Sequence, residues 1–283
     1  MKILLTGADG QLGRCIQDRA GDHELVALNR QQLDITDQGA VTDCVRLHRP
    51  DAVINAAAYT NVDQAESEPN LAYAVNRDGP AHIAVVCAEL DIPLIHISTD
   101  YVFDGTKRSP YTPDDNPNPI NVYGASKLAG EEAIRRIWEK HLIIRTSWLF
   151  SEYGHNFVKT MLRLAKERDE IRVVDDQIGC PTYAGDLAEV VLRLADRNVG
   201  WGRYHFCGGV ATSWYEFSGH IFRLWSEVSS TSIPALKPVG AVNFLSVAIR
   251  PNYSVLDSNT FVELVLNDSD SLDRVIKNVL LSI

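Results

Sequence analysis

Three regularly spaced glycines constrain the fold of this chain more than any other feature. Gly7, Gly10 and Gly13 give the pattern Gly-x-x-Gly-x-x-Gly directly after the apolar run of residues 2–6. The run predicts a buried strand, and the glycines allow a sharp turn into a helix whose first backbone amides stay free. This order is typical of a site for the pyrophosphate of a dinucleotide. Glycine triplets also arise in ordinary turns, and this spacing is not Gly-x-Gly-x-x-Gly, so the motif needs support from the rest of the chain.

Short apolar runs alternate with helical patterns through the first half of the chain. This alternation predicts an α/β fold, a Rossmann-type doubly wound parallel sheet. Ligands in such sheets bind at the carboxyl ends of the strands. The predicted strands are residues 2–6, 25–28, 52–55, 94–98 and 142–146. The predicted helices are residues 39–48, 71–90 (with a kink or break at Pro80) and 123–139. The strand ends expected to line the site are Gly7, Asn29, Asn55, Ser98 and Ser147.

The pattern loosens after residue 150, where helices are predicted over 157–166, 187–195 and 214–228. We therefore expect an NAD(P)-binding Rossmann domain over residues 1–150. Residues 151–283 are expected to form mainly a smaller C-terminal substrate-binding lobe, with some segments returning to the main sheet.

Composition excludes several function classes. The net charge is −10 with no block of Lys and Arg, so neither nucleic acid nor a membrane surface is an expected partner. No apolar run is as long as a membrane span, and a cytoplasmic location is expected. The five scattered cysteines predict reduced thiols, and the eight histidines show no metal-ligand spacing.

A tyrosine and a lysine mark the predicted chemistry. Tyr123 and Lys127 lie four residues apart and so share one face of the predicted helix. An ammonium beside a phenol favours the phenolate, lowers its pKa and makes the tyrosine a usable acid near neutral pH. Such pairs occur by chance in many helices. The glycine loop and the strand-end pair Ser98-Thr99 support the catalytic interpretation.

Longer strings are similar to a known family. The glycine loop, residues 55–59 and Tyr123-x-x-x-Lys127 resemble the extended short-chain dehydrogenase/reductase superfamily. Within it, Ser-Thr-Asp-Tyr-Val-Phe-Asp-Gly at 98–105 and Arg-Thr-Ser-Trp at 145–148 resemble the dTDP-4-dehydrorhamnose reductases. Further similar strings lie at 62–66, 121–127, 156–161 and 176–182. The resemblance runs from Met1 to about Tyr253 and fades beyond it.

The resemblance implies an activity and a role for each matching residue. The activity is NAD(P)H-dependent reduction of the C4 ketone of dTDP-4-dehydro-β-L-rhamnose to dTDP-L-rhamnose, the last step of dTDP-rhamnose biosynthesis for surface polysaccharide. Tyr123 would donate the proton, Lys127 would hold the nicotinamide ribose, and Thr99 would bond the substrate oxygen. The implied cofactor contacts are Gly7, Gly10, Gln11, Leu12, Gly13, Asp34, Ile35, Ala57, Ala58 and Tyr59, and the implied substrate contacts are Thr99, Asp100 and Trp148.

Each of these positions has a structural alternative. Thr99 is also suited to capping a strand end, and Asp34 to capping a helix. Asp100 fits a turn, and Trp148 fits an apolar core. Arg250, in a string that resembles the family near its C-terminus, fits an ion pair as well as a substrate contact.

The second strand end bears on the choice of cofactor. A simple NAD site has an Asp or Glu there to bond the ribose hydroxyls. This chain has Asn29 and Arg30 instead. Arg30 is placed to pair with a 2′-phosphate, which predicts NADPH with NADH also accepted, because Asp34 offsets part of the gain. The alternative is that Arg30 is a solvated loop residue.

Metal binding departs from the family pattern. Some members hold Mg²⁺ with acidic side chains at a homodimer interface, and the matching positions here are Cys15 and Gly185. Neither offers a hard oxygen ligand from its side chain. We therefore expect no bound Mg²⁺, and a monomer or weak homodimer.

Two other functions stay open from the sequence. One is a nucleotide-sugar epimerase or dehydratase of the same superfamily, which shares Tyr-x-x-x-Lys. The other is a non-catalytic NADP-binding regulatory subunit resembling that of methionine adenosyltransferase. The strings around Asp100 and Trp148 favour the reductase, and the intact Thr99, Tyr123 and Lys127 argue against a purely regulatory role.

Overall fold

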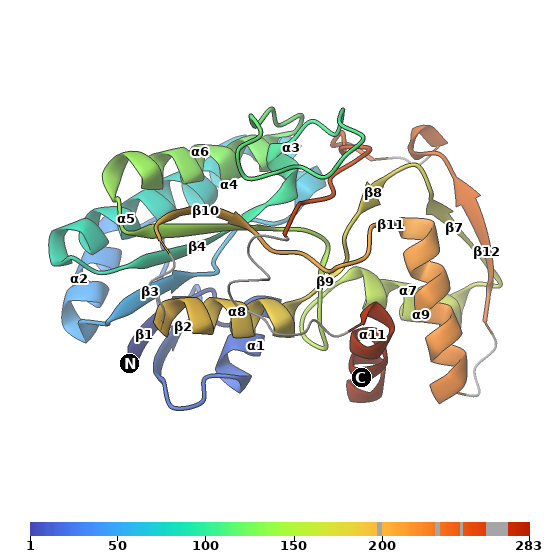
Figure 1. The fold of residues 1–283 in the computed structure, drawn as a ribbon, viewed down its shortest axis with the longest axis horizontal. Coiled ribbons are helices and arrows are strands. Elements are labelled where there is room, and N and C mark those ends of the chain that lie inside the picture. Colours follow the sequence, from blue (N-terminus) through green and yellow to red (C-terminus); the bar gives the residue numbers. More distant parts are fainter. Residues whose placement is uncertain (197–199, 230–232, 244–245, 259–270) are drawn as a thin grey trace.

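The computed structural model describes residues 1–196, 200–229, 233–243, 246–258 and 271–283. Its main layer is a six-stranded parallel sheet in the order β10-β5-β4-β3-β1-β2 (Figure 1). The strands are β1 (Lys2–Thr6), β2 (Glu24–Leu28), β3 (Ala52–Asn55), β4 (Leu94–Thr99), β5 (His141–Thr146) and β10 (Gly202–His205). The predicted Rossmann-type fold is confirmed, and its first five strands match the predicted ranges to within one residue at each end.

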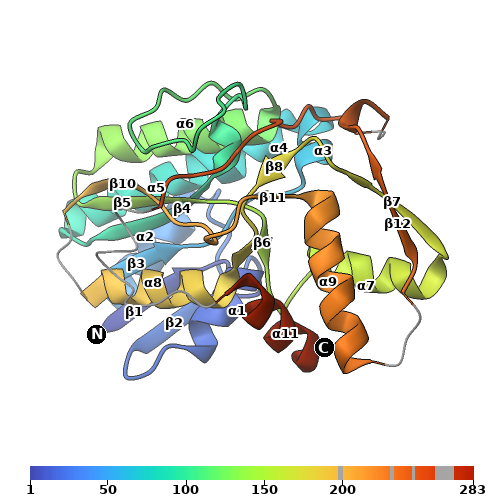
Figure 2. The ribbon, with the colours of Figure 1, turned by 45° about the vertical axis from the view of Figure 1, so that its right-hand side comes forward.

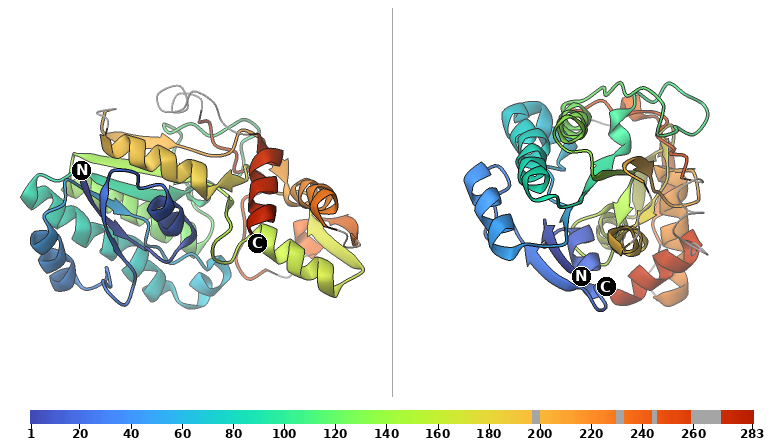
Figure 3. Two further views of the ribbon diagram at one scale, coloured as in Figure 1. Left: turned by 90° about the horizontal axis from the view of Figure 1, so that it is seen from below. Right: turned by 60° about the vertical axis from the view of Figure 1, so that its left-hand side comes forward.

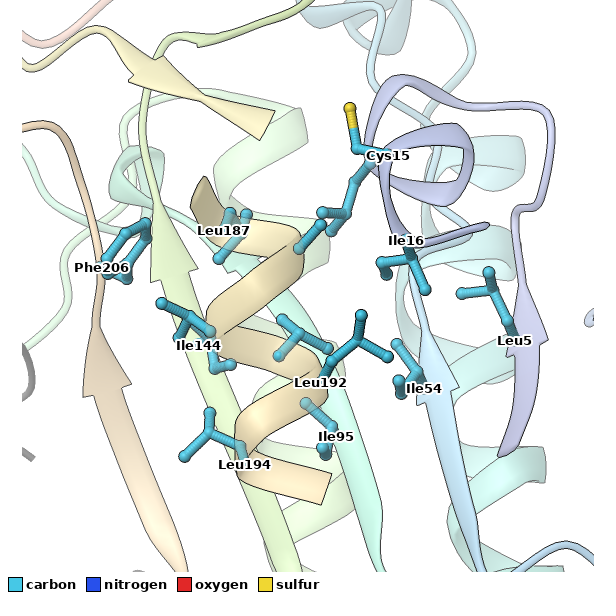
Figure 4. Packing of buried hydrophobic residues seen from close by; sticks show 14 of the residues in the cluster. Leu5, Cys15, Ile16, Ile54, Ile95, Ile144, Leu187, Leu192, Leu194 and Phe206 are labelled. Atoms are coloured by element: carbon cyan, nitrogen blue, oxygen red, sulfur yellow. The ribbon is translucent and has the colours of Figure 1, made fainter. Parts of the chain in front are cut away.

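Helices cover both faces of the sheet, as the end-on view in Figure 3 shows. On one face α1 (Gln11–Asp18) and α8 (Ala184–Asp196) pack against alternate strand residues such as Ile54, Ile95 and Ile144 (Figure 4). On the other face lie α2 (Gln38–His48), α5 (Gly79–Leu90) and α6 (Val122–Ile137). Because the strands are buried on both faces, they appear in sequence as nearly continuous apolar runs.

The predicted helix over residues 71–90 is interrupted, as Pro80 indicated. It consists of α4 (Pro69–Tyr73), a π-helical turn η1 (Ala74–Asp78) and α5. A proline ring clashes with the carbonyl four residues earlier, here that of Asn76, which accounts for the changed helical turn. The displaced carbonyl packs against Gly130 of α6, where a Cβ would lie 2.0 Å from the Asn76 oxygen.

A smaller group of elements lies beside the carboxyl ends of the strands (Figure 2). It contains α7 (Phe157–Glu167), α9 (Trp214–Val228) and α11 (Leu272–Ser282), with the parallel pair β7 (Glu170–Val174) and β12 (Ala235–Val239). Phe150, Phe217 and Ile276 are among the residues of its apolar core. Short pairs connect it to the sheet: β6 (Leu149–Phe150) with β9 (Thr182–Tyr183), and β8 (Ile178–Gly179) with β11 (Thr212–Ser213).

The three helices predicted after residue 150 are confirmed as α7, α8 and α9. Both α8 and β10 pack into the main sheet although they come late in the sequence. The division of the chain at residue 150 stays a prediction. In the part of the chain that the structure describes, no helix is both long and apolar enough to cross a membrane.

Candidate active site

A cavity of about 800 Å³ opens at the carboxyl ends of the strands. Most residues singled out from the sequence line it: Gly7, Gly10, Gln11, Leu12, Asn29, Arg30, Asp34, Ile35, Ala57, Ala58, Tyr59, Thr99, Asp100, Tyr123, Lys127 and Trp148. Gly13 is not among the lining residues. Of the five strand ends, Gly7, Asn29, Ser98 and Ser147 line the cavity. The prediction for Asn55 is wrong, because its side chain is fully buried below the cavity.

The glycine loop fits a pyrophosphate. Gly7 has φ +73°, and a Cβ there would lie 2.6 Å from the Ala57 nitrogen. A Cβ on Gly13 would lie 2.2 Å from the Gly7 oxygen, so Gly13 is needed for close packing of α1 on the loop. Gly10 caps α1 without a side-chain hydrogen bond. The first amides of α1 therefore stay available to an anion.

Two contacts place the start of α6 beside the end of β4. The Asn121 side chain accepts a hydrogen bond from the Gly124 amide at 2.8 Å and so caps the helix. A Cβ on Gly124 would lie 2.1 Å from the Tyr101 carbonyl oxygen, so only glycine allows this approach. The Tyr101 ring meets the Tyr123 ring edge-on, with centroids 5.8 Å apart. The backbone thus brings Tyr123 to the strand end that carries Thr99.

The environment of Tyr123 differs from the sequence expectation. Burial raises the pKa of Tyr123 to about 12, the Thr99 hydroxyl lowers it, and the Asp100 carboxylate raises it. The predicted lowering of this pKa by Lys127 is wrong for this structure, because the Lys127 ammonium donates to the Ile97 carbonyl at 2.6 Å. A phenol of such pKa stays protonated at neutral pH, yet it is a stronger acid than water, whose pKa is about 15.7. Tyr123 is therefore suited to donating a proton to an alkoxide.

Lys127 is almost completely enclosed, with 2% of its surface exposed. Burial lowers its pKa to about 8, and the Glu131 carboxylate raises it. Lys127 Nζ also lies 3.4 Å from His96 Nε2. Its charge state is therefore sensitive to its neighbours near neutral pH.

The structure is compatible with both interpretations of Thr99, because this residue caps a short helix and also lines the cavity. Its hydroxyl accepts a hydrogen bond from the Tyr101 amide at 3.1 Å, which caps the short 3-10 helix η2 (Asp100–Val102). It also donates to Asp100 at 3.0 Å and lines the cavity. Burial raises the pKa of Asp100 to about 7, against the lowering effect of the Ser254 and Thr99 hydroxyls. Among the described residues, no donor has hydrogen-bonding geometry to Asp100 Oδ2.

Trp148 lies at the cavity wall and also packs against the apolar core of the smaller group of elements. Its φ of +47° is left-handed, which is rare for a bulky side chain and costs on the order of 1–3 kcal/mol. The ring stacks on Trp214, with centroids 3.4 Å apart and planes at 7°. A Cβ on Gly179 would lie 2.5 Å from the Trp148 ring. Trp214, which also lines the cavity, was missed from the sequence because its partner is 66 residues away.

The end of the cavity that follows strand β2 is more exposed. Arg30 Nε lies 3.8 Å from Asp34 Oδ2, with 72% of the Arg30 side chain exposed. Asp34 also accepts from the Thr36 amide and hydroxyl, and these bonds lower the pKa of Asp34. Asn29 accepts from the Gln32 amide and so closes the turn. Asp34 thus forms a turn and also faces the cavity, and Arg30 is neither buried nor rigidly held.

Two supporting groups were not expected from the sequence. Asn76, in the π-helical turn η1, accepts from the Tyr59 amide at 2.8 Å and donates to the Tyr59 carbonyl and the Ser126 hydroxyl. It therefore ties the loop of Tyr59 to α6. No local signal distinguishes Asn76, because it is directly followed by the charged residues Arg77 and Asp78.

The second group is a buried ion pair below the cavity. Arg145 donates twice to Glu131, at 2.9 and 2.7 Å, and both side chains are at most 1% exposed. Ser98 donates to the same carboxylate at 2.5 Å. Glu131 follows Lys127 by one helical turn, so this ion pair, with Ser98, joins α6 to strands β4 and β5.

Arg250 forms an ion pair outside the cavity. Arg250 Nη2 donates to Asp63 at 2.7 Å, and Asp63 also accepts from the Ala248 amide. The hydrogen bond from Arg250 contributes most to lowering the pKa of Asp63 to about 2. Of the two interpretations left open, the structure shows the ion pair, which anchors residues 246–250 to α3 (Val62–Ser67).

Cys15 and Gly185, which match the Mg²⁺-binding positions of some family members, have other surroundings here. Cys15 is fully buried and belongs to the apolar core between α1 and the sheet. A Cβ on Gly185 would lie 2.3 Å from the Tyr183 ring. Within the described ranges, no three His, Cys, Asp or Glu side chains are grouped as a metal site. Independence from Mg²⁺ stays a prediction.

Comparison with known proteins gives matches along the whole chain. A family model described as the RmlD substrate binding domain matches residues 1–281. A protein of Aggregatibacter actinomycetemcomitans named dTDP-4-dehydrorhamnose reductase is 41% identical over 287 residues, with 98% of each chain covered. One of Sinorhizobium fredii with the same name is 40% identical and covers 99% of this chain and 98% of its own.

Comparison with solved structures also gives matches to proteins named dTDP-4-dehydrorhamnose reductase. A Bacillus anthracis dTDP-4-dehydrorhamnose reductase in complex with NADP superposes with a TM-score of 0.93 at 38% identity, covering 100% of this chain and 99% of its own. A Thermus thermophilus UDP-glucose 4-epimerase, at 19% identity and a TM-score of 0.83, covers 100% of this chain and 98% of its own and shares only the fold. The match continues well past Tyr253, where the resemblance was expected to fade. The chain therefore belongs to the RmlD substrate binding domain family.

Proposed function

We propose that this chain reduces the C4 ketone of dTDP-4-dehydro-β-L-rhamnose to dTDP-L-rhamnose with NADPH as the hydride donor. The observation that carries the proposal is the joint presence of Thr99, Tyr123 and Lys127 at one cavity in a chain of this family. Relatives at 40–41% identity over nearly the full length are named dTDP-4-dehydrorhamnose reductase. The product would serve polysaccharide synthesis, and one relative at 41% identity is named spore coat polysaccharide biosynthesis protein SpsK.

The catalytic residues have distinct roles in this proposal. When bound, NADPH supplies the hydride to C4. Tyr123 donates its proton to the C4 oxygen, and the Thr99 hydroxyl bonds the same oxygen as negative charge develops there. Lys127, which lines the same cavity, would hold the nicotinamide ribose.

The remaining lining residues divide between cofactor and sugar. Gly7, Gly10, Gln11 and Leu12 would meet the pyrophosphate at the start of α1, with Gly13 packing behind them. Asp34 and Ile35 would lie by the adenine, with Asn29 and Arg30 at the 2′ position of its ribose. Ala57, Ala58 and Tyr59 would line the path of the cofactor. Asp100, which lines the cavity, would contact the sugar, and Trp148 would meet the face of the sugar ring.

NADPH is the proposed cofactor, with NADH also accepted. The Bacillus anthracis relative was solved in complex with NADP. In this chain Arg30 lines the cavity just after the end of β2, and its pairing with Asp34 is long at 3.8 Å. A phosphate would compete with Asp34 for the guanidinium.

The test is stoichiometric. The purified chain should oxidise one NADPH for each molecule of dTDP-4-dehydro-L-rhamnose consumed, followed by the loss of reduced-nicotinamide absorbance and by chromatography of the dTDP-sugar. An epimerase or dehydratase would convert a nucleotide sugar without net oxidation of NADPH. A regulatory subunit would bind NADPH and turn nothing over.

A second keto sugar sharpens the substrate assignment. One relative, from Streptomyces niveus and 38% identical, is named dTDP-4-keto-6-deoxy-D-glucose reductase. Both keto sugars should therefore be offered, each with and without the epimerase that interconverts them. If the D-gluco keto sugar, offered without the epimerase, is reduced as fast as the L-rhamno keto sugar, the L-rhamnose assignment is contradicted.

A further inference from the structure

A chain of buried polar side chains leads from β1 to Lys127 below the cavity. The Thr6 hydroxyl donates to Asn55 Oδ1 at 2.7 Å, and Asn55 Nδ2 lies 3.0 Å from His96 Nδ1. His96 Nε2 then lies 3.4 Å from Lys127 Nζ. Thr6, Asn55 and His96 are each at most 1% exposed, and none of the three lines the cavity. None of the roles proposed above involves Thr6, Asn55 or His96.

The hydrogen bonds of Asn55 determine which nitrogen of His96 carries a proton. The Ala57 backbone amide, which can only donate, lies 3.1 Å from Asn55 Oδ1. The amide of Asn55 is therefore oriented with Oδ1 toward Ala57 and Thr6 and with Nδ2 toward His96. Nδ2 donates, so His96 Nδ1 accepts. The proton of the neutral imidazole must then be on Nε2, facing Lys127.

His96 stays neutral. Its ring is fully buried, and this burial, followed by the charge of Lys127 and then His141, holds the pKa of His96 well below its usual range. His141 is on the neighbouring strand β5. Glu131 on α6 is the one carboxylate among the described residues that acts on the pKa of Lys127.

The Nε2–H of His96 acts differently on the two forms of Lys127. An ammonium has no lone pair to accept a hydrogen bond, so its N–H groups would oppose the Nε2–H. A neutral amine has one lone pair, which can accept from Nε2–H while an amine hydrogen is donated to the Ile97 carbonyl at 2.6 Å. The hydrogen-bonded side chains that end in His96 therefore favour the neutral amine of Lys127.

We propose that His96 is a positioning residue for Lys127: its Nε2–H bonds the neutral amine and so controls how readily Lys127 releases its proton. This inference rests on the proposed function, in which Lys127 holds the cofactor ribose. The ammonium form of Lys127 holds the ribose and His96 stabilises the amine form, so His96 governs how much of Lys127 is charged near neutral pH.

The test is the pH dependence of NADPH binding and of kcat/KM in three variants of His96. His96→Phe keeps the size of the ring and removes both nitrogens. His96→Asn keeps an acceptor for Asn55 but places no donor at Lys127. His96→Gln places an amide N–H near the position of Nε2 and so keeps the donor.

We expect NADPH affinity in the parent to fall as the pH rises through the pKa of Lys127, because the ammonium holds the ribose. This fall is the alkaline limb of the pH profile. Without the Nε2–H the amine loses a hydrogen bond, the pKa of Lys127 rises, and this alkaline limb moves upward by about one pH unit in His96→Phe and His96→Asn. His96→Gln should restore the position of the limb in the parent. Lys127→Met should remove the limb, which assigns it to Lys127.

His141→Gln is the matched control. It alters a second mostly buried histidine on the adjacent strand, whose Nδ1 faces the Trp138 carbonyl, and should leave the limb in place. The inference is overturned if the limb stays unmoved in folded His96→Phe and His96→Asn, with folding checked by thermal melts. If the parent binds NADPH with no alkaline limb, the ribose role of Lys127 fails as well. Failure to reduce the keto sugar, with the limb and its shifts intact, would contradict only the proposed function.

Discussion

The floor of the cavity and its outer rim are held in opposite ways. The floor, formed by Thr99, Tyr123 and Lys127, rests on buried hydrogen bonds and on the Glu131–Arg145 ion pair. The rim, formed by Asn29, Arg30 and Asp34, is held by turns and by a long ion pair whose Arg30 side chain is 72% exposed. Interactions in the interior are stronger because the effective dielectric constant is low there, and breaking one leaves a buried polar group without a partner, which costs free energy. Exposed interactions compete with water and contribute less. We therefore expect large effects at the floor and small ones at the rim.

The largest effect is expected below the floor, at Arg145. Arg145→Met leaves the Glu131 carboxylate buried and unpaired, which should lower the free energy of unfolding by about 3–5 kcal/mol. Urea denaturation of parent and variant measures it. The double variant Arg145→Met with Glu131→Leu removes both charges and should recover much of this loss. A single variant as stable as the parent would show that the floor does not depend on the pair.

Tyr123→Phe tests the floor itself. Loss of the general acid should reduce kcat by at least ~10²-fold. NADPH affinity should stay close to that of the parent, because the phenol acts on the substrate oxygen. Steady-state kinetics and fluorescence titration give the two quantities. Near-native turnover in the purified variant would contradict the role of Tyr123.

Thr99→Val should have a smaller effect on the same step. The substitution keeps the shape and removes one hydroxyl from the developing charge, so kcat should fall roughly 10- to 100-fold, more than NADPH affinity. Because the Thr99 hydroxyl lowers the pKa of Tyr123, its loss should raise that pKa further. The pH–rate profile measures this. A profile that neither falls nor shifts would leave Thr99 with its capping role alone.

At the rim, Arg30→Ala should change only the choice of cofactor. The parent should prefer NADPH over NADH by about tenfold in kcat/KM, which is about 1.4 kcal/mol and within reach of one exposed charge-assisted contact. The variant should lose this preference and keep its activity with NADH. If the parent prefers NADH, or if the ratio is unchanged in Arg30→Ala, then Arg30 does not contact the phosphate.

Metal removal is expected to have no effect. Cys15 and Gly185 offer no oxygen ligands from their side chains, so EDTA should leave activity and the mass in solution unchanged. Activity assays and light scattering before and after chelation are sufficient. A loss that Mg²⁺ restores would mean that other groups bind the metal.

Much of the cavity was predictable because its signals are local. Buried parallel strands appear as apolar runs, and their order along the chain predicted the edge where Gly7, Thr99 and Trp148 meet. The left-handed φ of Gly7 belongs to the turn itself. Pro80 indicated the interruption before α5, because its ring affects a carbonyl only four residues away.

The sequence by itself determined the sheet, the glycine loop, the positions of Tyr123 and Lys127 on one helix face, and the family to which these motifs point. Only the tertiary structure decided the charge environment of that site. Burial raises the pKa of Tyr123 where the Tyr123–Lys127 spacing alone predicted a lowering. His96, Glu131 and Trp214 meet their partners across 31, 14 and 66 residues respectively. Spacing along the chain reports which residues share a helix face or a strand end, but desolvation and hydrogen bonding depend on what the fold packs around them.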